Sequence, residues 1–519
     1  MAIFVFFENT SHNVLFYFSV LTAILYMEPQ KFLIQNQDHL VPVIDAPIGS
    51  IKGALLQSTH GRNIFSYGGI PYAEPPVGKL RFKRPKPIKG WKDGVFDGRG
   101  HSKKCVQLNG ITPIPAVVGT EDCLQLNVYV PEVENPPKDG LPVMFWIHGG
   151  GFVAGEGGPH FYGPQHLLDK DVILVTINYR LGIFGYLTLG AEALGGNQAM
   201  WDQYEALKWV NKNIEAFGGN PKKVTIFGES AGGYSVSYHL TSRKSRGLFH
   251  SAIIQSGPLM TGHLRVDEFR KHADLHQEFS SAVGCPIEEN VEETVACLQN
   301  KPVKHLMKNL KMFDQCNTLA TGTMAYPVVW SPYDDHETVQ DPFFAQHPVE
   351  ILKSGEYNKV PIMIGTAKDE GVLHTATLLQ DPEMFQYFKS NWDVCAGVSF
   401  LDQFFIDQPS KDLVKKAQKV KDFYFGSTEL ELDDWTFTNL TRAFTDSGFF
   451  LGTELMLPYL KDTKTYYYHL DHLGSFSMGD IFSLSKIGLV TNVLKKFVGI
   501  CETKKLGVSH ADDLLYLFK

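Results

Sequence analysis

In the middle of the chain, segments with the apolar pattern of buried strands alternate with segments that have helical spacing. Residues 143–147 and 172–177 are almost unbroken apolar runs, which are typical of strands covered on both faces. Residues 199–217 instead carry apolar side chains at helical spacing. A second strand–helix pair follows, with a short apolar strand at 224–227 and a helix of small and apolar residues at 231–240. This alternation of strand and helix predicts a parallel, doubly wound sheet and an α/β fold class.

The same patterns extend the sheet in both directions. Residues 49–56 and 63–70 are short apolar runs bounded by turn residues, and they predict antiparallel edge strands. Residues 124–130 alternate between apolar and polar side chains and predict another strand. Late in the chain, residues 360–365 and 466–470 return to strand character. We expect these late strands to continue the same sheet.

The remaining pattern and the composition favour one large domain. Residues 262–355 are mainly helical with polar faces, and we expect them to form a cap around the functional site. No repeat or linker divides the 519 residues, so a single domain is expected over residues 28–519. A hydrophobic content of 44% indicates a large core. The net charge of −8 and the scattered Lys and Arg residues argue against nucleic-acid binding.

Residues 1–27 form an apolar N-terminal segment. Its run of 13 mostly apolar residues at 14–26 is too short for a stable membrane span and suits the hydrophobic region of a secretory signal peptide. Residues 1–13 contain no Lys or Arg, however, and no small-residue cleavage site follows. A signal peptide, a signal anchor and a mis-assigned start before Met27 all remain open. We therefore expect a secreted or ER-lumenal protein, or a cytoplasmic one if the segment is an artefact.

A candidate nucleophile lies between the predicted strand at 224–227 and the helix that follows. The sequence there is Gly228-Glu229-Ser230-Ala231-Gly232. A Gly-x-Ser-x-Gly pattern at a strand-to-helix corner holds the serine on a strained turn with its hydroxyl exposed at the top of the sheet. The pattern alone arises by chance in many chains, but its position between strand and helix favours Ser230 as a nucleophile.

A nucleophilic serine needs a base, and the base needs an orienting carboxylate. In α/β-hydrolases these partners follow the serine in the order acid and then histidine. Asp369 and Glu370 closely follow the predicted strand at 360–365, and His510 lies in a later turn. The residues alone do not decide between the two carboxylates, and three other histidines compete with His510. These competitors are His374, His469 and His472.

A run of glycines supplies candidate donors for an oxyanion hole. The predicted strand at 143–147 is followed by His148 and three consecutive glycines. Such a turn leaves backbone N–H groups free to stabilise negative charge during acyl transfer. We expect the donors to be the N–H groups of Gly150, Gly151 and Ala231.

Several motifs together resemble one family over almost the whole chain, from about Val43 to Phe518. This sequence is similar to the type-B carboxylesterases and cholinesterases, and in particular to their insect-type carboxylesterases. The resemblance implies an α/β-hydrolase fold with helical cap insertions and hydrolysis of small-molecule carboxylic esters through an acyl-enzyme, without cofactor or metal. The motifs are Gly69–Pro76, Glu121–Leu124, His148–Phe152, Asn178–Gly182, Gly196–Gln198, Asp202-Gln203, the Ser230 pentapeptide and Gly507–Phe518.

The resemblance also assigns roles that the residues alone leave open. It implies Glu370 rather than Asp369 as the acid beside Ser230 and His510, with the oxyanion donors named above. Cysteine spacing permits either short disulfide loops or free thiols, and the resemblance implies disulfides. Asn439 begins an Asn-x-Thr sequon and is a predicted glycosylation site. The implied disulfides are Cys105–Cys123 and Cys285–Cys297, and the implied ion pairs are Arg81–Glu121 and Arg180–Asp202.

Three departures from the family pattern matter for function. Residues 106–122 contain no aromatic side chain, which argues against choline esters because cholinesterases bind the ammonium group on a tryptophan there. Juvenile hormone esterases usually have Gln where Glu229 stands. The chain also stops nine residues after His510, where family members continue, so we expect a domain incomplete at its C-terminus. The alternative function is a non-catalytic or sequestering binding or adhesion protein. The sequence gives no indication of oligomeric state.

Overall fold

The computed structural model describes most of the predicted domain. The apolar N-terminal segment 1–27 lies outside the described residues. Within the described ranges, every helix is too short or too polar to traverse a bilayer. The described residues are 41–91, 94–109, 116–190, 193–260, 269–313, 329–333, 335, 339–378, 381–401, 409–482 and 505–519.

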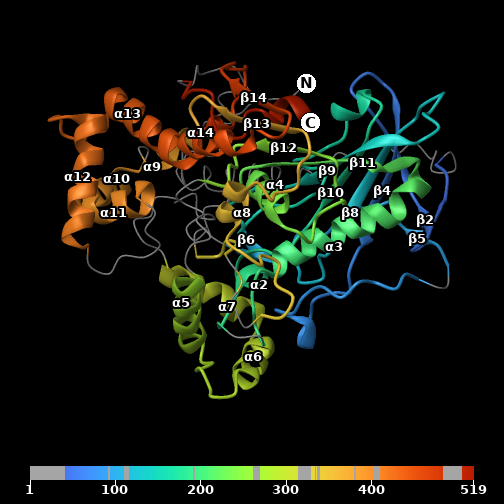
Figure 1. Cartoon of the computed structure of the whole chain (residues 1–519), viewed down its shortest axis with the longest axis horizontal. Helices are drawn as coiled ribbons and strands as arrows, with labels where there is room; N and C mark the ends of the chain where they lie inside the picture. The colour runs from blue at the N-terminus through green and yellow to red at the C-terminus, as the bar shows by residue number, and fades with distance from the viewer. Residues whose placement is uncertain are drawn as a thin grey trace, which may run out of the picture.

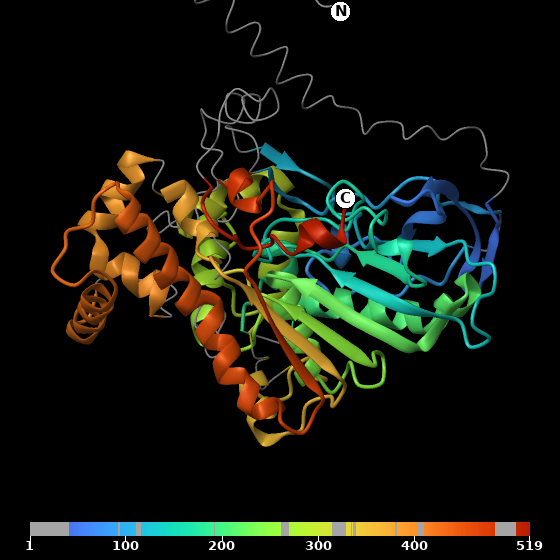
Figure 2. The same ribbon diagram turned by 90° about the horizontal axis from the view of Figure 1, so that it is seen from above.

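A twisted sheet forms the centre of the molecule (Figure 2). Hydrophobic residues cover both faces of its middle strands, as the unbroken apolar runs predicted. From one edge to the other its strands are β14 (Thr465–Leu470), β13 (Ile362–Ala367), β12 (Ser251–Gln255), β11 (Gly219–Glu229), β9 (Leu141–Ile147), β10 (Ile173–Ile177), β8 (Gln125–Pro131), β4 (Asn63–Pro71) and β3 (Ala54–Gln57).

Strand directions confirm the predicted topology. Neighbouring strands from β14 through β10 are parallel, whereas β10, β8, β4 and β3 pair antiparallel. The early strands therefore form an antiparallel edge on a parallel, doubly wound sheet. Parallel strands present their carboxyl ends at one edge, which is where ligands bind in such folds.

Two details of the strand prediction were wrong or incomplete. The predicted strand at 49–56 is two strands, β2 (Gly49–Lys52) and β3, because the chain leaves one sheet for another at Gly53. A Cβ at Gly53 would lie 2.7 Å from the Ser66 carbonyl oxygen, so no larger residue fits this crossing. β2 pairs instead with β1 (Ile44–Ala46) and β5 (Phe96–Asp97). The strand β12 was not predicted.

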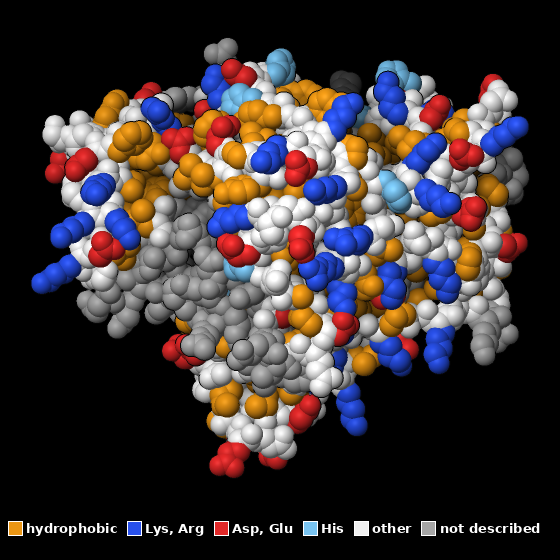
Figure 3. All heavy atoms as spheres, in the orientation of Figure 1, with side chains coloured by type: hydrophobic (Ala, Val, Ile, Leu, Met, Phe, Trp, Pro, Cys, Tyr) orange, Lys and Arg blue, Asp and Glu red, His pale blue; other side chains and the backbone are white. Residues whose placement is uncertain are grey.

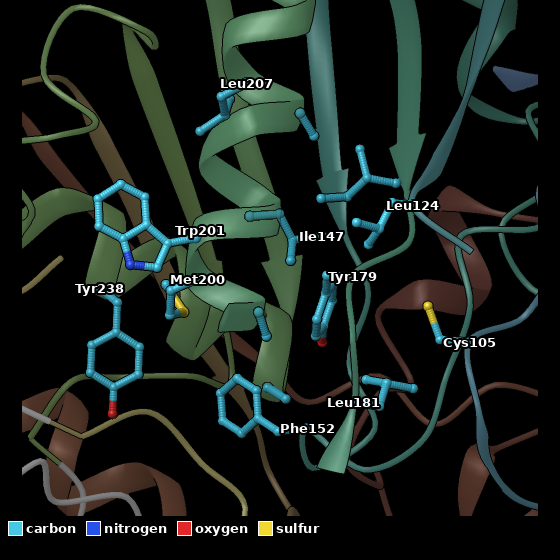
Figure 4. Close-up of a cluster of buried hydrophobic side chains, with 14 of the residues drawn as sticks. Cys105, Leu124, Ile147, Phe152, Tyr179, Leu181, Met200, Trp201, Leu207 and Tyr238 are labelled. Carbon is cyan, nitrogen blue, oxygen red and sulfur yellow. The ribbon is translucent and has the colours of Figure 1, made fainter. Parts of the chain in front are cut away.

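Two helices pack on one face of the sheet around the central core. The predicted helix at 199–217 is observed as α3 (Gln198–Asn213), followed by a 3-10 turn to Phe217, and α4 (Ala231–Thr241) follows β11. Leu207 on α3, Ile147 on β9 and Tyr238 on α4 contribute to the same buried cluster (Figure 4). The core therefore fixes the helix that begins at the candidate nucleophile.

The opposite face of the sheet has a smaller aromatic core. Phe518 packs on Trp146 of β9 and Phe227 of β11, with ring centroids 4.9 Å and 6.2 Å away. Toward the β14 edge the same face is less covered, since Met363 and Tyr466 are 42% and 49% exposed. This face is thus closed at its centre and partly open at one end.

Two groups of helices project from the sheet (Figure 1). In the described part of residues 262–355, the predicted helical character is confirmed. A second group has a hydrophobic core of its own around Phe388 and Trp392. The first group contains α5 (Phe269–Ala282), α6 (Val291–Asn300) and α7 (Val303–Asn309), and the second contains α10 (Pro382–Ser390), α11 (Trp392–Phe400), α12 (Lys411–Phe425) and α13 (Asp434–Thr445). The helix α8 (Pro348–Ser354) instead packs against α4.

Cross-links and ion pairs implied by the family resemblance are present. Both disulfides form, and each closes a short loop. Arg180 and Asp202 are buried and make two charge-assisted hydrogen bonds of 2.6 and 2.7 Å. Elsewhere, charged side chains of both signs are interspersed over the face shown in Figure 3. The confirmed disulfides are Cys105–Cys123 and Cys285–Cys297, and the second confirmed ion pair is Arg81–Glu121.

Candidate active site

Ser230 lies at the sharp turn between β11 and α4. Its backbone has φ 55° and ψ −125°, a conformation that non-glycine residues rarely adopt. The flanking glycines permit this turn, because a Cβ at Gly232 would lie 1.9 Å from the Ile147 carbonyl oxygen of β9. A Cβ at Gly228 would similarly meet the Gly232 backbone at 2.5 Å. The predicted corner is therefore observed, and its geometry depends on both glycines.

Glu370 is the carboxylate that reaches the candidate base. It follows β13 and is completely buried. One carboxylate oxygen, Oε2, lies 2.6 Å from His510 Nδ1. The other oxygen accepts hydrogen bonds from the Ser256 hydroxyl at 2.6 Å and from the Ala367 N–H at 2.7 Å. These two donors fix the carboxylate in the direction of the imidazole ring.

Asp369 has a different task in the same turn. Its N–H donates to the Val508 carbonyl, and its Oδ2 accepts from the Val508 N–H, both at 2.9 Å. Gly507 makes this approach possible, since a Cβ there would lie 2.5 Å from Asp369 Oδ2. Asp369 thus attaches the loop that contains His510 to the end of β13. Its neighbour Glu370 contacts the imidazole ring.

The competing histidines lie elsewhere in the fold. His374 stacks on Phe444, with ring centroids 4.5 Å apart. His469 lies on β14, and His472 follows that strand. Of the four candidates, His510 is the one whose ring contacts the Glu370 carboxylate.

The second ring nitrogen of His510 lies beside a second carboxylate. His510 Nε2 is 2.8 Å from Glu229 Oε1, although the angles are not those of a hydrogen bond. The Ser230 hydroxyl makes no hydrogen bond within the described part of the chain. A Cβ at Gly149 would lie 2.7 Å from Glu229 Oε2 and 3.1 Å from Ser230 Cβ, so the carboxylate borders the nucleophile. Catalytic hydrogen bonds are often unformed before substrate binds.

The charges around His510 favour its protonated form. Burial by itself lowers the pKa of His510, but the negative charges of Glu229 and Glu370 outweigh it and hold the pKa well above the usual value of 6.5. Burial raises the pKa of Glu229. The imidazole and its two carboxylates therefore hold a proton more tightly than an isolated histidine does.

A pH profile tests the influence of Glu229. Protonated His510 cannot accept a proton, so hydrolysis should be lost on the acid side as the pH falls through its pKa. Glu229→Gln removes one of the negative charges that raise this pKa, and the acid limb of kcat/KM should therefore move to lower pH. The measurement is kcat/KM for a neutral ester against pH in both proteins. An acid limb that stays in place or moves to higher pH would contradict the assignment.

The glycine run begins beside the nucleophile, at Gly149, and continues in a backbone conformation that favours glycine. Gly150 and Gly151 have φ angles of 106° and 60°. A Cβ at Gly150 would lie 2.3 Å from the Ala154 carbonyl oxygen. No group of the described residues accepts a hydrogen bond from either glycine N–H. Ala231 begins α4, where N–H groups have no acceptor within the helix. The N–H groups of Gly150 and Gly151 are therefore free of acceptors among the residues that the structure describes, and the Ala231 N–H directly follows Ser230.

Ser256 is a site residue that the sequence pattern did not reveal. It follows β12, is buried, and has a positive φ of 52°. Its N–H donates to the Gly365 carbonyl and its hydroxyl donates to Glu370 Oε1. The only local signal was a short apolar run, residues 252–254, followed by Gln255, Ser256 and Gly257.

Removal of the Ser256 hydroxyl should impair the site without abolishing it. Hydrogen bonds to charged groups are worth about 1.5–3 kcal/mol. Because Glu370 keeps its bond from Ala367, we expect Ser256→Ala to lower kcat by about tenfold, with folding retained. Ser251→Ala, at the other end of β12, is the control and should leave kcat unchanged. Equal kcat values for the two variants would show that Ser256 does not orient Glu370.

Two further predictions concern metals and glycosylation. Across the described ranges, no group of three or more His, Cys, Asp and Glu side chains could hold a metal ion.

Asn439 lies on α13 and is partly exposed, and its side-chain amide donates to the Trp435 carbonyl. The Thr441 hydroxyl of the same sequon is buried against Thr375. Glycosylation of Asn439 stays a prediction.

Comparisons with known proteins find relatives over almost the whole chain. The carboxylesterase family model matches residues 40–519. A juvenile hormone esterase from Tribolium castaneum is 36% identical over 484 residues, covering 92% of this chain and 78% of the relative. A carboxylic ester hydrolase from Bombus ignitus is 33% identical and covers 95% and 82%.

A solved structure extends the likeness to the fold. The crystal structure of juvenile hormone esterase from Manduca sexta, with OTFP covalently attached, superposes with a TM-score of 0.74 and 25% identity. The match covers 92% of this chain and 83% of that one. The sheet with its flanking helices is thus an α/β-hydrolase fold. The chain belongs to the carboxylesterase family, whose members hydrolyse carboxylic esters.

Proposed function

We propose that Ser230, His510 and Glu370 form the catalytic triad of this ester hydrolase. The observation that carries the proposal is the 2.6 Å contact between Glu370 Oε2 and His510 Nδ1, beside a serine on a strained strand-to-helix turn. With Nδ1 engaged by the carboxylate, Nε2 is the ring nitrogen left to exchange a proton with the serine. For this transfer, His510 Nε2 must exchange its contact with Glu229 for one with the Ser230 hydroxyl.

The reaction then proceeds through an acyl-enzyme. Ser230 Oγ attacks the ester carbonyl carbon as His510 Nε2 takes the hydroxyl proton. The N–H groups of Gly150, Gly151 and Ala231 stabilise the oxyanion. The bond to the alcohol oxygen breaks, and the alcohol leaves with the proton from His510. A water molecule attacks the acyl-enzyme in the same way, which releases the acid and regenerates Ser230, while Glu370 stays ionised throughout.

The substrates we propose are neutral carboxylic esters. Residues 106–122 contain no aromatic side chain to bind a quaternary ammonium group. The buried Glu229 beside the nucleophile would also repel a substrate with a nearby anionic group. The binding-protein alternative is not favoured, because the similar proteins are named as esterases and hydrolases.

Covalent labelling tests the proposed nucleophile. A fluorophosphonate forms a stable bond with a serine that is activated by a neighbouring base. The wild-type protein should hydrolyse a short-chain aryl ester, and one equivalent of fluorophosphonate should abolish that activity. Mass spectrometry should place the added phosphonyl group on the peptide that contains Ser230. A label on another serine, or activity that persists after stoichiometric labelling, would refute the assignment.

We also propose that the protein works outside the cytosol. Two disulfides close short loops in the folded chain. Disulfides form and persist in the secretory pathway and outside the cell, whereas cytosolic reductants keep thiols reduced. This supports the predicted secreted or ER-lumenal location.

A further inference from the structure

A chain of buried polar side chains runs along the core side of α4. It starts at Ser245, beyond the C-terminal end of the helix, and passes through His239, Gln203 and Ser235. It ends at the carbonyl of Ala231, the first residue of α4. All four side chains are completely buried, so solvent cannot take part in these contacts. The proposed mechanism assigns no step to any of them.

Each link of this chain has hydrogen-bond length. Ser245 Oγ lies 2.7 Å from His239 Nδ1, and His239 Nε2 lies 3.0 Å from Gln203 Oε1. Gln203 Nε2 lies 3.0 Å from Ser235 Oγ, which lies 2.9 Å from the Ala231 oxygen. The links join α3, which carries Gln203, to both ends of α4.

The contact between Ser235 and the Ala231 carbonyl determines which group donates in every other hydrogen bond of the chain. A carbonyl oxygen only accepts, so the single hydroxyl hydrogen of Ser235 points to Ala231. Ser235 Oγ must then accept from the Gln203 amide nitrogen, and the Gln203 oxygen accepts from His239 Nε2–H. Burial lowers the pKa of His239 to about 3, so the ring is neutral and Nδ1 accepts from the Ser245 hydroxyl. All four hydrogens therefore point toward the first turn of α4.

We propose that this hydrogen-bonded chain positions the oxyanion donor, with His239 and Ser235 as positioning residues that hold the first turn of α4 and the Ala231 N–H at its start. The proposal rests on the proposed function, because Ala231 matters only if its N–H stabilises an oxyanion. Ser230, directly before this turn, has a strained backbone that its surroundings must hold. Hydrogen bonds aligned in one direction polarise one another, so the chain holds the Ala231 carbonyl more firmly than one isolated hydroxyl would. Fixing this carbonyl also fixes the residue whose N–H is the proposed donor.

Ser235→Ala removes the last link and is the direct test. Loss of a whole oxyanion donor lowers kcat by about 10²–10³-fold, and a misdirected one should cost less, so we expect a fall of about tenfold with KM changed by less than about twofold. Binding of a trifluoromethyl ketone, which forms a tetrahedral adduct at the serine, should weaken by about the same factor as kcat/KM. Rates are referred to active sites titrated with fluorophosphonate, so misfolded protein does not count.

Ser242→Ala is the matched control. Ser242 is also buried, but it caps the opposite end of α4, directly after Thr241, and its hydroxyl donates to the Phe343 carbonyl at 3.1 Å. Its kcat and ketone affinity should equal those of the wild type. If Ser235→Ala behaves like Ser242→Ala, the positioning role is wrong, even though the wild-type protein is labelled at Ser230 and the proposed function stands.

Two substitutions of His239 keep the test decisive if Ser235→Ala does not fold. A glutamine amide nitrogen takes the place of Nε2–H and still donates to Gln203, whereas asparagine is too short to reach it. His239→Gln should therefore retain most of the wild-type kcat per titrated site, and His239→Asn should lose about as much as Ser235→Ala. Equal kcat values for His239→Gln and His239→Asn would overturn the proposal.

Discussion

Ser230→Ala is expected to remove hydrolysis almost completely. Without the hydroxyl no acyl-enzyme forms, and only the oxyanion donors and substrate binding remain to accelerate direct attack by water. Loss of the nucleophile in serine hydrolases lowers kcat by about 10⁴–10⁶-fold. The measurement is the turnover of a short-chain aryl ester at matched protein concentration, together with fluorophosphonate labelling, which should also disappear.

The folded state of this variant provides its control. Ala at position 230 keeps the Cβ and removes one oxygen, so the packing around β11 and α4 is unchanged. We expect a thermal unfolding temperature within about 2 °C of the wild type, because the lost hydroxyl is only partly buried and makes no hydrogen bond within the described residues, so stability should change by less than about 0.5 kcal/mol. Full turnover by correctly folded Ser230→Ala would exclude the proposed mechanism.

Glu370→Gln should have the second-largest effect. A neutral amide cannot stabilise the imidazolium that forms when His510 takes the serine proton, and it favours the wrong ring tautomer. The corresponding change in other serine hydrolases lowers kcat by about 10⁴-fold, and we expect about 10³–10⁴-fold here. The measurement is kcat for the same aryl ester across a range of pH.

Asp369→Asn is a closely matched control for that experiment. It makes the same carboxylate-to-amide change one residue earlier. An asparagine oxygen still accepts from the Val508 N–H, so the loop carrying His510 stays attached to the end of β13. We expect kcat within about tenfold of the wild type, because a retained neutral hydrogen bond is worth only about 1 kcal/mol less than the charged one. A larger loss for Asp369→Asn than for Glu370→Gln would exchange the roles of the two acids.

The parts of the site whose geometry is set by residues adjacent in the sequence were predictable from the sequence. The pentapeptide around Ser230 and the glycine run at 149–151 specify backbone conformations that few other residues permit, so local pattern sufficed. The central strands were equally easy to predict, since strands buried on both faces have continuous apolar sequences. The parallel, doubly wound character of the sheet then followed from the alternation of strands and helices, although β12 was missed and no strand order was predicted.

The choice between Asp369 and Glu370 could not be made from the residues. Both follow the same strand, and what separates them is the pairing of Asp369 with the loop at 507–509, more than a hundred residues later. That pairing turns the next side chain toward His510. The role of Ser256 was missed for the same reason, because its hydroxyl is defined by a contact with Glu370 across 114 positions of sequence.

The change of sheet at Gly53 could not be predicted from the hydrophobic pattern either. Residues 49–56 have uniform strand character, and nothing local signals that the chain changes sheets in the middle. The reason is steric and distant, since the Ser66 carbonyl and the Tyr67 ring occupy the space of a side chain at position 53. A glycine within a strand indicates such an approach, but it does not say which segment approaches.

The strained backbone of Ser230 lowers the stability of the folded protein. A residue held at φ 55° and ψ −125° costs roughly 1–3 kcal/mol, which is a substantial part of the net stability of a typical domain. Glycine would relieve that strain at an entropic cost of only about 0.5–1 kcal/mol. Selection for thermal resistance alone would therefore favour loss of the serine, and a thermostable library sorted without an activity screen should accumulate inactive molecules at this position.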